Sequence, residues 1–285
     1  MKNAIEVSGL TKDYGTFQLD VSFTVPGGSI MGLIGENGAG KSTTLKAMLG
    51  LIRPDGGSVK LLGLDAAEEG SGLKEEIGVV FDECPFHDQM NASMVNSVLA
   101  GIYSKWDREL FAAYLQKFDL PANKKLKEFS RGMKMKLSIA AALSHRPRLL
   151  LLDEATSGLD PVMRDEILDE FLAFICDEEH AILVSSHITS DLEKVADYIT
   201  YLHKGKVAMS GARDELLESH GKLVCTRDEL AEVERSFIVG TRVSQYSCEA
   251  LIRSRADFKR RYPNLTVDPV TLEDLMIFTV RGDAR

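Results

Sequence analysis

The stretch from Gly35 to Ser42, with the sequence GENGAGKS, has the residue types and spacing of a loop that holds a polyphosphate. Its three glycines allow a tight concave turn whose N–H groups point inward, and a helix beginning near Lys41 would add its positive N-terminal end. The Lys41 ammonium would reach the β- and γ-phosphates, and the Ser42 hydroxyl would bind Mg²⁺. The loop predicts a site for a nucleoside triphosphate, and the alternative is a glycine-rich turn without a ligand.

Two carboxylates, Asp153 and Glu154, follow the continuous apolar run at residues 149–152. A buried strand of a parallel sheet has this pattern, and its carboxyl end would lie at the same sheet edge as the phosphate loop. We expect Asp153 to bind the Mg²⁺ shell and Glu154 to polarise the attacking water. The alternative is an acidic pair at an ordinary strand end.

Two ring-bearing residues are further candidates, one on each side of these motifs. Tyr14 precedes the phosphate loop, where its ring could stack on a purine or simply pack against the protein. His187 follows the apolar run at residues 181–184, and a histidine at that strand end could contact a γ-phosphate, although a single histidine is more often structural.

Helix starts supply the remaining candidates. Ser130 and Gly132 stand in a lysine-rich stretch just before an apolar helical stripe, where the N-terminal end of a helix could hold a second anion. A lysine run is otherwise a solvated face. Asp160, followed by Pro161, has the pattern of an N-cap, and capping alone would explain it.

The elements around these residues follow an α/β pattern. Apolar and polar residues alternate from 17 to 25, which with residues 5–10 predicts an antiparallel layer. Apolar runs before the phosphate loop, at 77–81, 149–152 and 181–184, predict a mostly parallel central sheet. Strand signals vanish between about 85 and 147, where helices at residues 93–103 and after Asp107 are expected.

We therefore expect a P-loop NTPase fold of the α/β class with a mostly parallel sheet and an N-terminal antiparallel layer. Residues 1–217 form the predicted nucleotide-binding domain, with a helical subdomain inserted at about 85–147. Residues 218–285 form a small α+β C-terminal extension in which no chemical motif is found.

Composition limits the classes of partner. The 285 residues are 44% hydrophobic, as in a globular protein, and the formal net charge of −9 argues against nucleic acid. The four cysteines are widely spaced, which favours a reducing compartment over a disulfide framework or zinc ribbon. The sequence shows neither a signal peptide nor an apolar run of about 18 residues, so we expect a cytoplasmic protein that does not cross a membrane by itself.

Taken in order, the motifs over about residues 3–217 resemble the nucleotide-binding subunit of an ABC transporter. The resemblance implies ATP and Mg²⁺ as ligands, with Tyr14 stacking on adenine, Asp153 on magnesium, Glu154 as catalytic base and His187 as the switch histidine. It also implies that Ser130 and Gly132 bind the γ-phosphate of ATP held by an opposite subunit, and that Asp160 is the D-loop aspartate. The Walker A loop then comprises Gly35, Glu36, Asn37, Gly38, Ala39, Gly40, Lys41, Ser42 and Thr43.

The same resemblance implies a homo- or heterodimer that closes around two ATP and drives separate transmembrane permease subunits from the inner face of the membrane. Pro85, Phe86 and Met90 are expected to lie in the groove where a permease helix would rest. The single nucleotide domain and the closing TLEDL at residues 271–275 resemble bacterial exporters of the antibiotic-resistance or peptide type. The rivals are a permease-free ATPase acting on a cytosolic assembly and a nucleotide sensor without turnover.

Two positions depart from the family pattern. Asp82 stands where the family has a glutamine that contacts magnesium, and an ionised aspartate can bind the metal but cannot donate a hydrogen bond. Arg131 replaces a glycine of the signature motif, where its cation could attract a γ-phosphate or crowd the approach.

Overall fold

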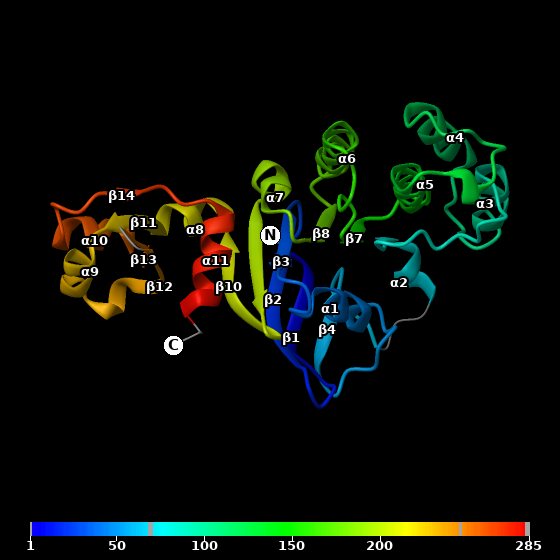
Figure 1. Ribbon diagram of the computed structural model, residues 1–285. Helices are drawn as coiled ribbons and strands as arrows, with labels where there is room; N and C mark the ends of the chain where they lie inside the picture. Colours follow the sequence, from blue (N-terminus) through cyan, green and yellow to red (C-terminus); the bar gives the residue numbers. More distant parts are fainter. Residues whose placement is uncertain (1, 68–70, 245–246, 283–285) are drawn as a thin grey trace.

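The computed structural model describes residues 2–67, 71–244 and 247–282, so the outermost residues of the two predicted domains, 1 and 283–285, lie outside it. Figure 1 shows a central sheet with a group of helices on one side and the C-terminal extension on the other. Within the described ranges, no helix is both long and apolar enough to span a membrane.

One ten-stranded sheet forms the centre, in the order β5-β4-β1-β2-β10-β9-β3-β8-β7-β6. The predicted parallel strands are confirmed: every residue of β3, β7 and β8 is buried, as their apolar sequences require for strands covered on both faces. The parallel part comprises β3 (Ile30–Gly35), β6 (Ile77–Val80), β7 (Leu149–Asp153), β8 (Ala181–Ser186) and β9 (Tyr198–His203).

The predicted antiparallel layer is also confirmed, and it continues the same sheet. Leu19, Val21, Phe23 and Val25 are buried on one face of β2, while the residues between them are exposed. The strand at Lys206–Ala212 meets β2 in a single parallel pairing of Lys206 with Asp20, and its antiparallel pairing with β9 joins this layer to the parallel strands. Its strands are β1 (Asn3–Asp13), β2 (Gln18–Pro26), β4 (Gly56–Leu61), β5 (Leu64–Asp65) and β10 (Lys206–Ala212).

The predicted helical insertion lies to the right in Figure 1. Asp107 caps its second helix as expected, because its Oδ1 accepts hydrogen bonds from the N–H groups of Glu109 and Leu110. The expected helix at residues 93–103 ends earlier, at Leu99, where Gly101 favours a turn instead of another helical residue. The elements are α3 (Ala92–Leu99), α4 (Arg108–Lys117), η1 (Leu126–Glu128) and α5 (Arg131–Leu143).

The helices outside the insertion pack against the strands whose carboxyl ends bear the predicted site residues. Helix α1 follows the phosphate loop directly and contacts β2, β3 and β7, whereas α7 contacts β3 and α6. These helices are α1 (Lys41–Met48), α2 (Ser71–Glu75), α6 (Pro161–Phe174), α7 (Thr189–Val195) and α8 (Arg213–Ser219).

The extension has a four-stranded antiparallel sheet and one helix that returns to the main body. Leu272, Leu275 and Phe278 of α11 belong to the central hydrophobic core, and the Leu272 N–H donates to Oε1 of Glu193 at 2.6 Å. The elements are β11 (His220–Cys225), α9 (Arg227–Glu232), η2 (Arg235–Phe237), β12 (Ile238–Val243), β13 (Cys248–Arg253), α10 (Arg255–Arg261), β14 (Val267–Asp268) and α11 (Leu272–Gly282).

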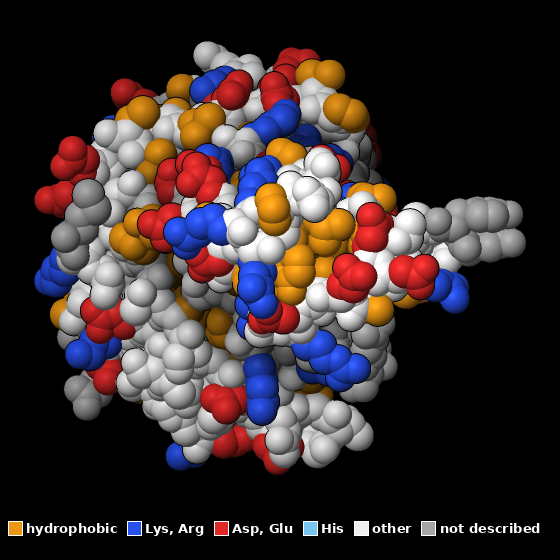
Figure 2. Space-filling model, turned by 90° about the vertical axis from the view of Figure 1, so that its left-hand side faces the viewer, with side chains coloured by type: hydrophobic (Ala, Val, Ile, Leu, Met, Phe, Trp, Pro, Cys, Tyr) orange, Lys and Arg blue, Asp and Glu red, His pale blue; other side chains and the backbone are white. Residues whose placement is uncertain are grey.

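Figure 2 views the molecule from the side of this extension. Acidic and basic side chains alternate there around a group of apolar ones, without a broad field of one sign. That face lacks the clustered basic charge on which binding to a nucleic acid backbone depends.

Candidate functional site

The phosphate loop connects β3 to α1 at the carboxyl edge of the parallel strands. Gly38 and Gly40 have φ angles of 81° and 110°, a region that favours glycine. A Cβ atom on Gly40 would also lie 2.8 Å from Leu19 Cδ1, and one on Gly35 would lie 2.7 Å from the Leu202 carbonyl oxygen. The predicted helix start at Lys41 is confirmed, so backbone N–H groups and a helix end converge on this loop.

Lys41 is buried at the mouth of the loop. Its Nζ donates to the Gly35 carbonyl at 2.8 Å and lies 3.3 Å from Oε1 of Glu154. A buried cation needs such compensation, and phosphate oxygens could replace the carboxylate as its partner.

Glu154 lies immediately after β7, in the left-handed backbone region at a φ of 53°. Its N–H donates to the Ser185 carbonyl at 3.1 Å, which holds the strained turn in place. Oε2 of its carboxylate lies 2.6 Å from Nδ1 of His187, while Oε1 faces Lys41. The turn therefore brings the predicted base, the predicted switch histidine and the loop lysine into direct contact.

Asp153 has a different environment from its neighbour. It is only 3% exposed, and its Oδ1 accepts a hydrogen bond from Ser185 Oγ at 2.5 Å, which orients the carboxylate. Adjacent residues of the strand end thus place one acid beneath the cavity and the other at its wall.

The cavity above the loop has a volume of about 650 Å³. Tyr14 is part of its wall with 49% of its surface exposed, and its ring centroid is 6.4 Å from that of Phe17. An exposed ring at the rim can stack on a planar base. The wall includes these predicted residues: Tyr14, Glu36, Asn37, Gly38, Ala39, Gly40, Lys41, Ser42, Thr43, Asp82, Glu154 and His187.

The other predicted positions do not line this cavity. Ser130 Oγ accepts the Met133 N–H at 3.2 Å and caps α5, and Gly132 is buried against Met163. Asp160 caps α6 as the sequence predicted, because its Oδ1 accepts the N–H groups of Val162 and Met163 at 3.1 Å. Both capping side chains are thus engaged at the starts of their own helices.

Three residues of the cavity wall were absent from the predicted site: Phe17, Arg131 and Ser157. Phe17 is the first residue of the alternating run at residues 17–25, which predicts a strand and does not indicate a ligand contact. Arg131 departs from the signature motif, but its sequence position does not show which cavity its side chain lines. Ser157 lies three residues before the predicted cap Asp160, and that proximity is the one sequence signal that points to it.

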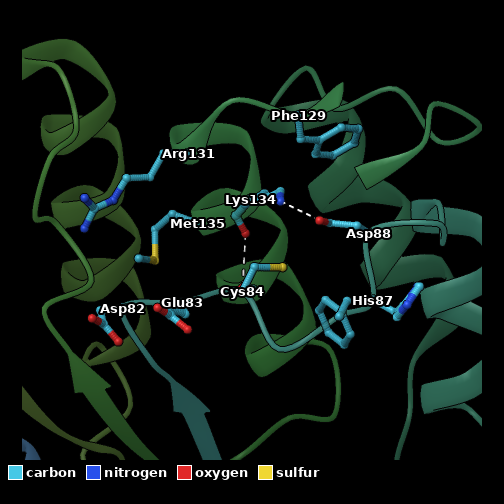
Figure 3. A pocket seen from close by; sticks show the side chains of 11 residues that line it. Asp82, Glu83, Cys84, His87, Asp88, Phe129, Arg131, Lys134 and Met135 are labelled. Carbon is cyan, nitrogen blue, oxygen red and sulfur yellow. Dashed lines mark hydrogen bonds and ion pairs between the residues drawn. The ribbon is translucent and has the colours of Figure 1, made fainter. Parts of the chain in front are cut away.

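A second cavity, of about 710 Å³, lies between the loop after β6 and helix α5 (Figure 3). Asp82 borders both cavities, and Phe86 lines this one, whereas Pro85 and Met90 do not. Nζ of Lys134 lies 2.7 Å from Oδ1 of Asp88. Their hydrogen bond lowers the pKa of the Asp88 carboxyl and raises the pKa of Lys134, so the pair fastens the loop to α5 across the neutral range.

Comparisons with known proteins show which family the chain resembles. The sequence profile of the ABC transporter family matches residues 19–157. The chain is 34% identical over 206 residues to the ABC transporter ATP-binding protein NatA of Bacillus subtilis, covering 70% of this chain and 83% of the relative. It is 33% identical over 273 residues to the daunorubicin/doxorubicin resistance ATP-binding protein DrrA of Streptomyces peucetius, covering 90% and 82%.

Another relative is the bacitracin transport ATP-binding protein BcrA of Enterococcus faecalis. The two chains are 36% identical over 210 residues, and the alignment covers 72% of this chain and 68% of the relative. Among solved structures, an ATP-binding subunit of an ABC transporter superposes with a TM-score of 0.69 at 28% identity, covering 75% of this chain and 92% of the other. A dimeric ATP-binding cassette in a post-hydrolysis state with ADP and Pi has the same fold, with a TM-score of 0.65 at 22% identity, covering 73% and 98%.

Proposed function

Since the chain belongs to the ATP-binding subunits of ABC transporters, we propose that it hydrolyses ATP at the cavity above residues 35–43 and drives a separate membrane permease. The observation that carries the proposal is the position of Glu154, which contacts Lys41 on one side and His187 on the other. We assign ATP hydrolysis to residues 1–217 and treat 218–285 as an extension.

The residue roles follow from these contacts. Phosphate binding would draw Lys41 away from Glu154 and leave Oε1 free to accept a proton from water. That water oxygen would then attack the γ-phosphorus, and ADP would leave. His187, 2.6 Å from the other carboxylate oxygen, would hold Glu154 in this orientation and face the γ-phosphate.

The oxygen donors near the loop fit magnesium. Ser42, Asp82 and the oriented Asp153 would hold it, because Mg²⁺ is usually bound by one or two carboxylates together with substrate phosphates. Accordingly, no cluster of three or more His, Cys, Asp or Glu side chains that could hold a metal alone occurs in residues 2–67, 71–244 and 247–282. Bound magnesium would neutralise charge on the β- and γ-phosphates.

We further propose that two copies, or this chain and a similar one, close head to tail around two ATP. Ser130 and Gly132 would then approach the γ-phosphate held by the partner. The support is their place at the start of α5, where Ser130 is exposed, outside the cavity of their own chain. Binding in this arrangement favours the closed state through the added contacts to ATP.

The permease would rest near the second cavity, which would keep the protein on the inner face of the membrane. At least half of the surface of Met94, Val98 and Ile102 is exposed, at 51%, 50% and 63%. These residues are spaced four apart, so they form one apolar stripe along α3 and the turn after it. Because relatives are named for bacitracin transport, lantibiotic transport and daunorubicin/doxorubicin resistance, we propose export of a compound of one of these types.

Two substitutions test the assignment. Lys41→Ala removes the cation that reaches the phosphates, so we expect binding of ATP, measured by calorimetry, to be strongly weakened. Glu154→Gln keeps the size of the side chain and should leave ATP binding intact while slowing phosphate release by about 10²- to 10⁴-fold, the usual contribution of a general base.

The matched control is Glu178→Gln, the same change at an exposed position outside the cavity wall. It should hydrolyse ATP at the parent rate. Parent-like turnover in Glu154→Gln would remove Glu154 from the role of base, and unchanged affinity in Lys41→Ala would contradict the phosphate site.

A further inference from the structure

Another cavity, of about 730 Å³, lies between the main body and the C-terminal extension. The hairpin of β9 and β10 forms one part of its wall, and residues of β11, β12, β13 and α11 form the rest. Its size is that of pockets that hold small molecules, which often lie where two parts of a protein meet. The proposed function gives this cavity no role.

The charges on the cavity wall are of one sign. Lys204, Lys206 and Arg253 line it with exposed side chains, and no aspartate or glutamate is among its described lining residues, although the chain has a formal net charge of −9. Elsewhere in the extension, Lys222 pairs with Asp274 at 3.0 Å. Within residues 2–67, 71–244 and 247–282, none of the three cavity cations forms an ion pair. Their N–H donors are thus available to an anion.

Strand pairing directs basic residues to this cavity from both sides. Lys206 lies opposite His203 across β9 and β10, and Arg253 lies opposite His220 across β11 and β13. Side chains at such opposed positions share one face of the sheet. Burial lowers the pKa of His220, and the positive charge of Arg253 lowers it further against the raising effect of the hydrogen bond to the Leu216 carbonyl. The body and the extension therefore each supply a cation, and His220 adds a neutral ring.

The hairpin on one side of this cavity also touches the phosphate loop. Nδ1 of His203 lies 2.8 Å from Oε1 of Glu36, and the Gly205 N–H, between the two cavity lysines, donates to the Ala39 carbonyl at 3.1 Å. The described lining residues of this cavity and of the nucleotide cavity nevertheless do not overlap. An anion here would occupy a site of its own, one hairpin away from the nucleotide.

We propose that this cavity binds a phosphate-bearing small molecule or lipid headgroup, whose phosphate is held by Lys204 and Lys206 of the body together with Arg253 of the extension. A phosphate ester carries a charge of about −1.5 to −2, and the arginine fork suits its oxygens. The cavity exceeds the size of a bare phosphate, and Met209 and Val239 offer apolar contacts to the rest of the ligand. Three cations are too few to follow a nucleic acid backbone.

The first arm of the experiment measures binding of radiolabelled inorganic pyrophosphate by equilibrium dialysis, with ADP and magnesium filling the nucleotide cavity. We expect saturable binding to the parent chain. Lys206→Gln and Arg253→Gln should each weaken it about tenfold, the loss expected for a charge-assisted hydrogen bond. The matched control is Lys60→Gln, the same change at an exposed strand position of the same sheet outside this cavity, which should stay within about twofold of the parent.

The second arm distinguishes the two sources of phosphate by flotation with vesicles of phosphatidylcholine and phosphatidylglycerol, against vesicles of phosphatidylcholine alone. Binding to the anionic vesicles that pyrophosphate displaces and that both variants lose would identify a lipid headgroup. Binding of pyrophosphate without binding to vesicles would identify a soluble phosphorylated compound.

The proposal is overturned if neither pyrophosphate nor the anionic vesicles bind, or if the binding persists unchanged in Lys206→Gln and Arg253→Gln. Both side chains are exposed, so these variants are expected to fold, and circular dichroism checks this. ADP is titrated first by calorimetry. Failure of ADP to bind would count against the proposed function alone, because the dependence of pyrophosphate binding on Lys206 and Arg253 still decides the second site.

Discussion

At the scale of single residues, the site depends on one carboxylate in an uncommon backbone conformation. Glu154 is one of the few described residues other than glycine with a positive φ, and its hydrogen bonds to Ser185 maintain that strain. A strained backbone conformation is kept only where the surrounding contacts hold it in place, and such residues are often found at functional sites. The strain turns Glu154 toward Lys41 and His187, while Asp153 remains buried beneath.

The cysteines allow a residue-scale prediction about burial. Burial, and secondarily the neighbouring Cys248, raises the pKa of the Cys225 thiol from its model-peptide value of 9.0 to about 11. A higher pKa means less thiolate, so at pH 8 the reactive fraction of Cys225 falls by about a hundredfold. We expect an alkylating reagent followed by mass spectrometry to modify the exposed Cys176 quickly and Cys225 only after unfolding.

Cys176 serves as the control in the same sample. The rate at Cys225 should rise with pH as its thiolate forms. Modification of Cys225 in the folded protein as fast as Cys176 at pH 8 would show that the extension does not bury this thiol.

At the scale of elements, the hairpin between β9 and β10 supports the phosphate loop. The Gly205 N–H donates to the Ala39 carbonyl at 3.1 Å, and the Gly205 carbonyl accepts the Asp20 N–H at 2.7 Å. The hairpin thereby joins the loop to the antiparallel strands, so we expect a change at this turn to alter the shape of the phosphate loop.

Gly205→Ala should be severely destabilising. Its φ is 77°, and a Cβ atom there would lie 1.8 Å from the Gln18 carbonyl oxygen, a backbone atom that cannot move independently of β2. Gly50→Ala is the matched control, since Gly50 has a φ of 69° with nothing within 4 Å of the added atom. We expect a loss in unfolding free energy of about 1–2 kcal/mol for Gly50→Ala from the left-handed backbone alone, and of at least about 3 kcal/mol for Gly205→Ala.

Urea denaturation followed by circular dichroism measures both values. Equal losses in the two variants would mean that β2 yields at Gln18, and that the hairpin does not hold the loop as described.

Local patterns explain which elements were predictable. The alternation of apolar and polar residues predicted β2, and the apolar runs predicted β3, β7 and β8. Asp107 and Asp160 predicted the starts of two helices. These signals could be interpreted because each depends on residues close in sequence. The placement of Arg131 against Gly158 depends on packing between segments that are distant in sequence. Phe17 and Tyr14 are only three residues apart and meet across one turn, in which the Tyr14 N–H donates to the Phe17 carbonyl. Sequence periodicity predicts the strand after this turn but carries no information about either contact.

At the scale of the whole molecule, the extension is attached to the ATPase body by α11. Its Phe278 is 2% exposed in the central core, and the Tyr201 hydroxyl donates to the Met276 carbonyl at 3.4 Å. Figure 1 shows α11 lying between the sheet of the extension and the central sheet. This return of the chain was not predicted, because residues 218–285 carry no motif that indicates where they pack.

The body, by contrast, holds the proposed site residues in two separate places. The phosphate loop, Glu154 and His187 line one cavity, while Ser130 and Gly132 lie at a helix start outside it. Under the proposed function, the phosphate loop binds ATP in a single chain, and Ser130 and Gly132 meet a phosphate only when a second chain brings its nucleotide to them. Pairing driven by ATP is therefore the central claim about the whole molecule.

Sedimentation velocity of Glu154→Gln with magnesium and saturating ATP tests this claim most directly, because the variant should hold ATP without splitting it. We predict a shift from single chains to pairs with ATP but not with ADP, and its loss in Ser130→Arg, which should still bind ATP as a single chain. If this chain is one half of a heterodimer, adding the similar subunit should restore the shift. Single chains throughout, with ATP demonstrably bound and the partner subunit present, would contradict the account.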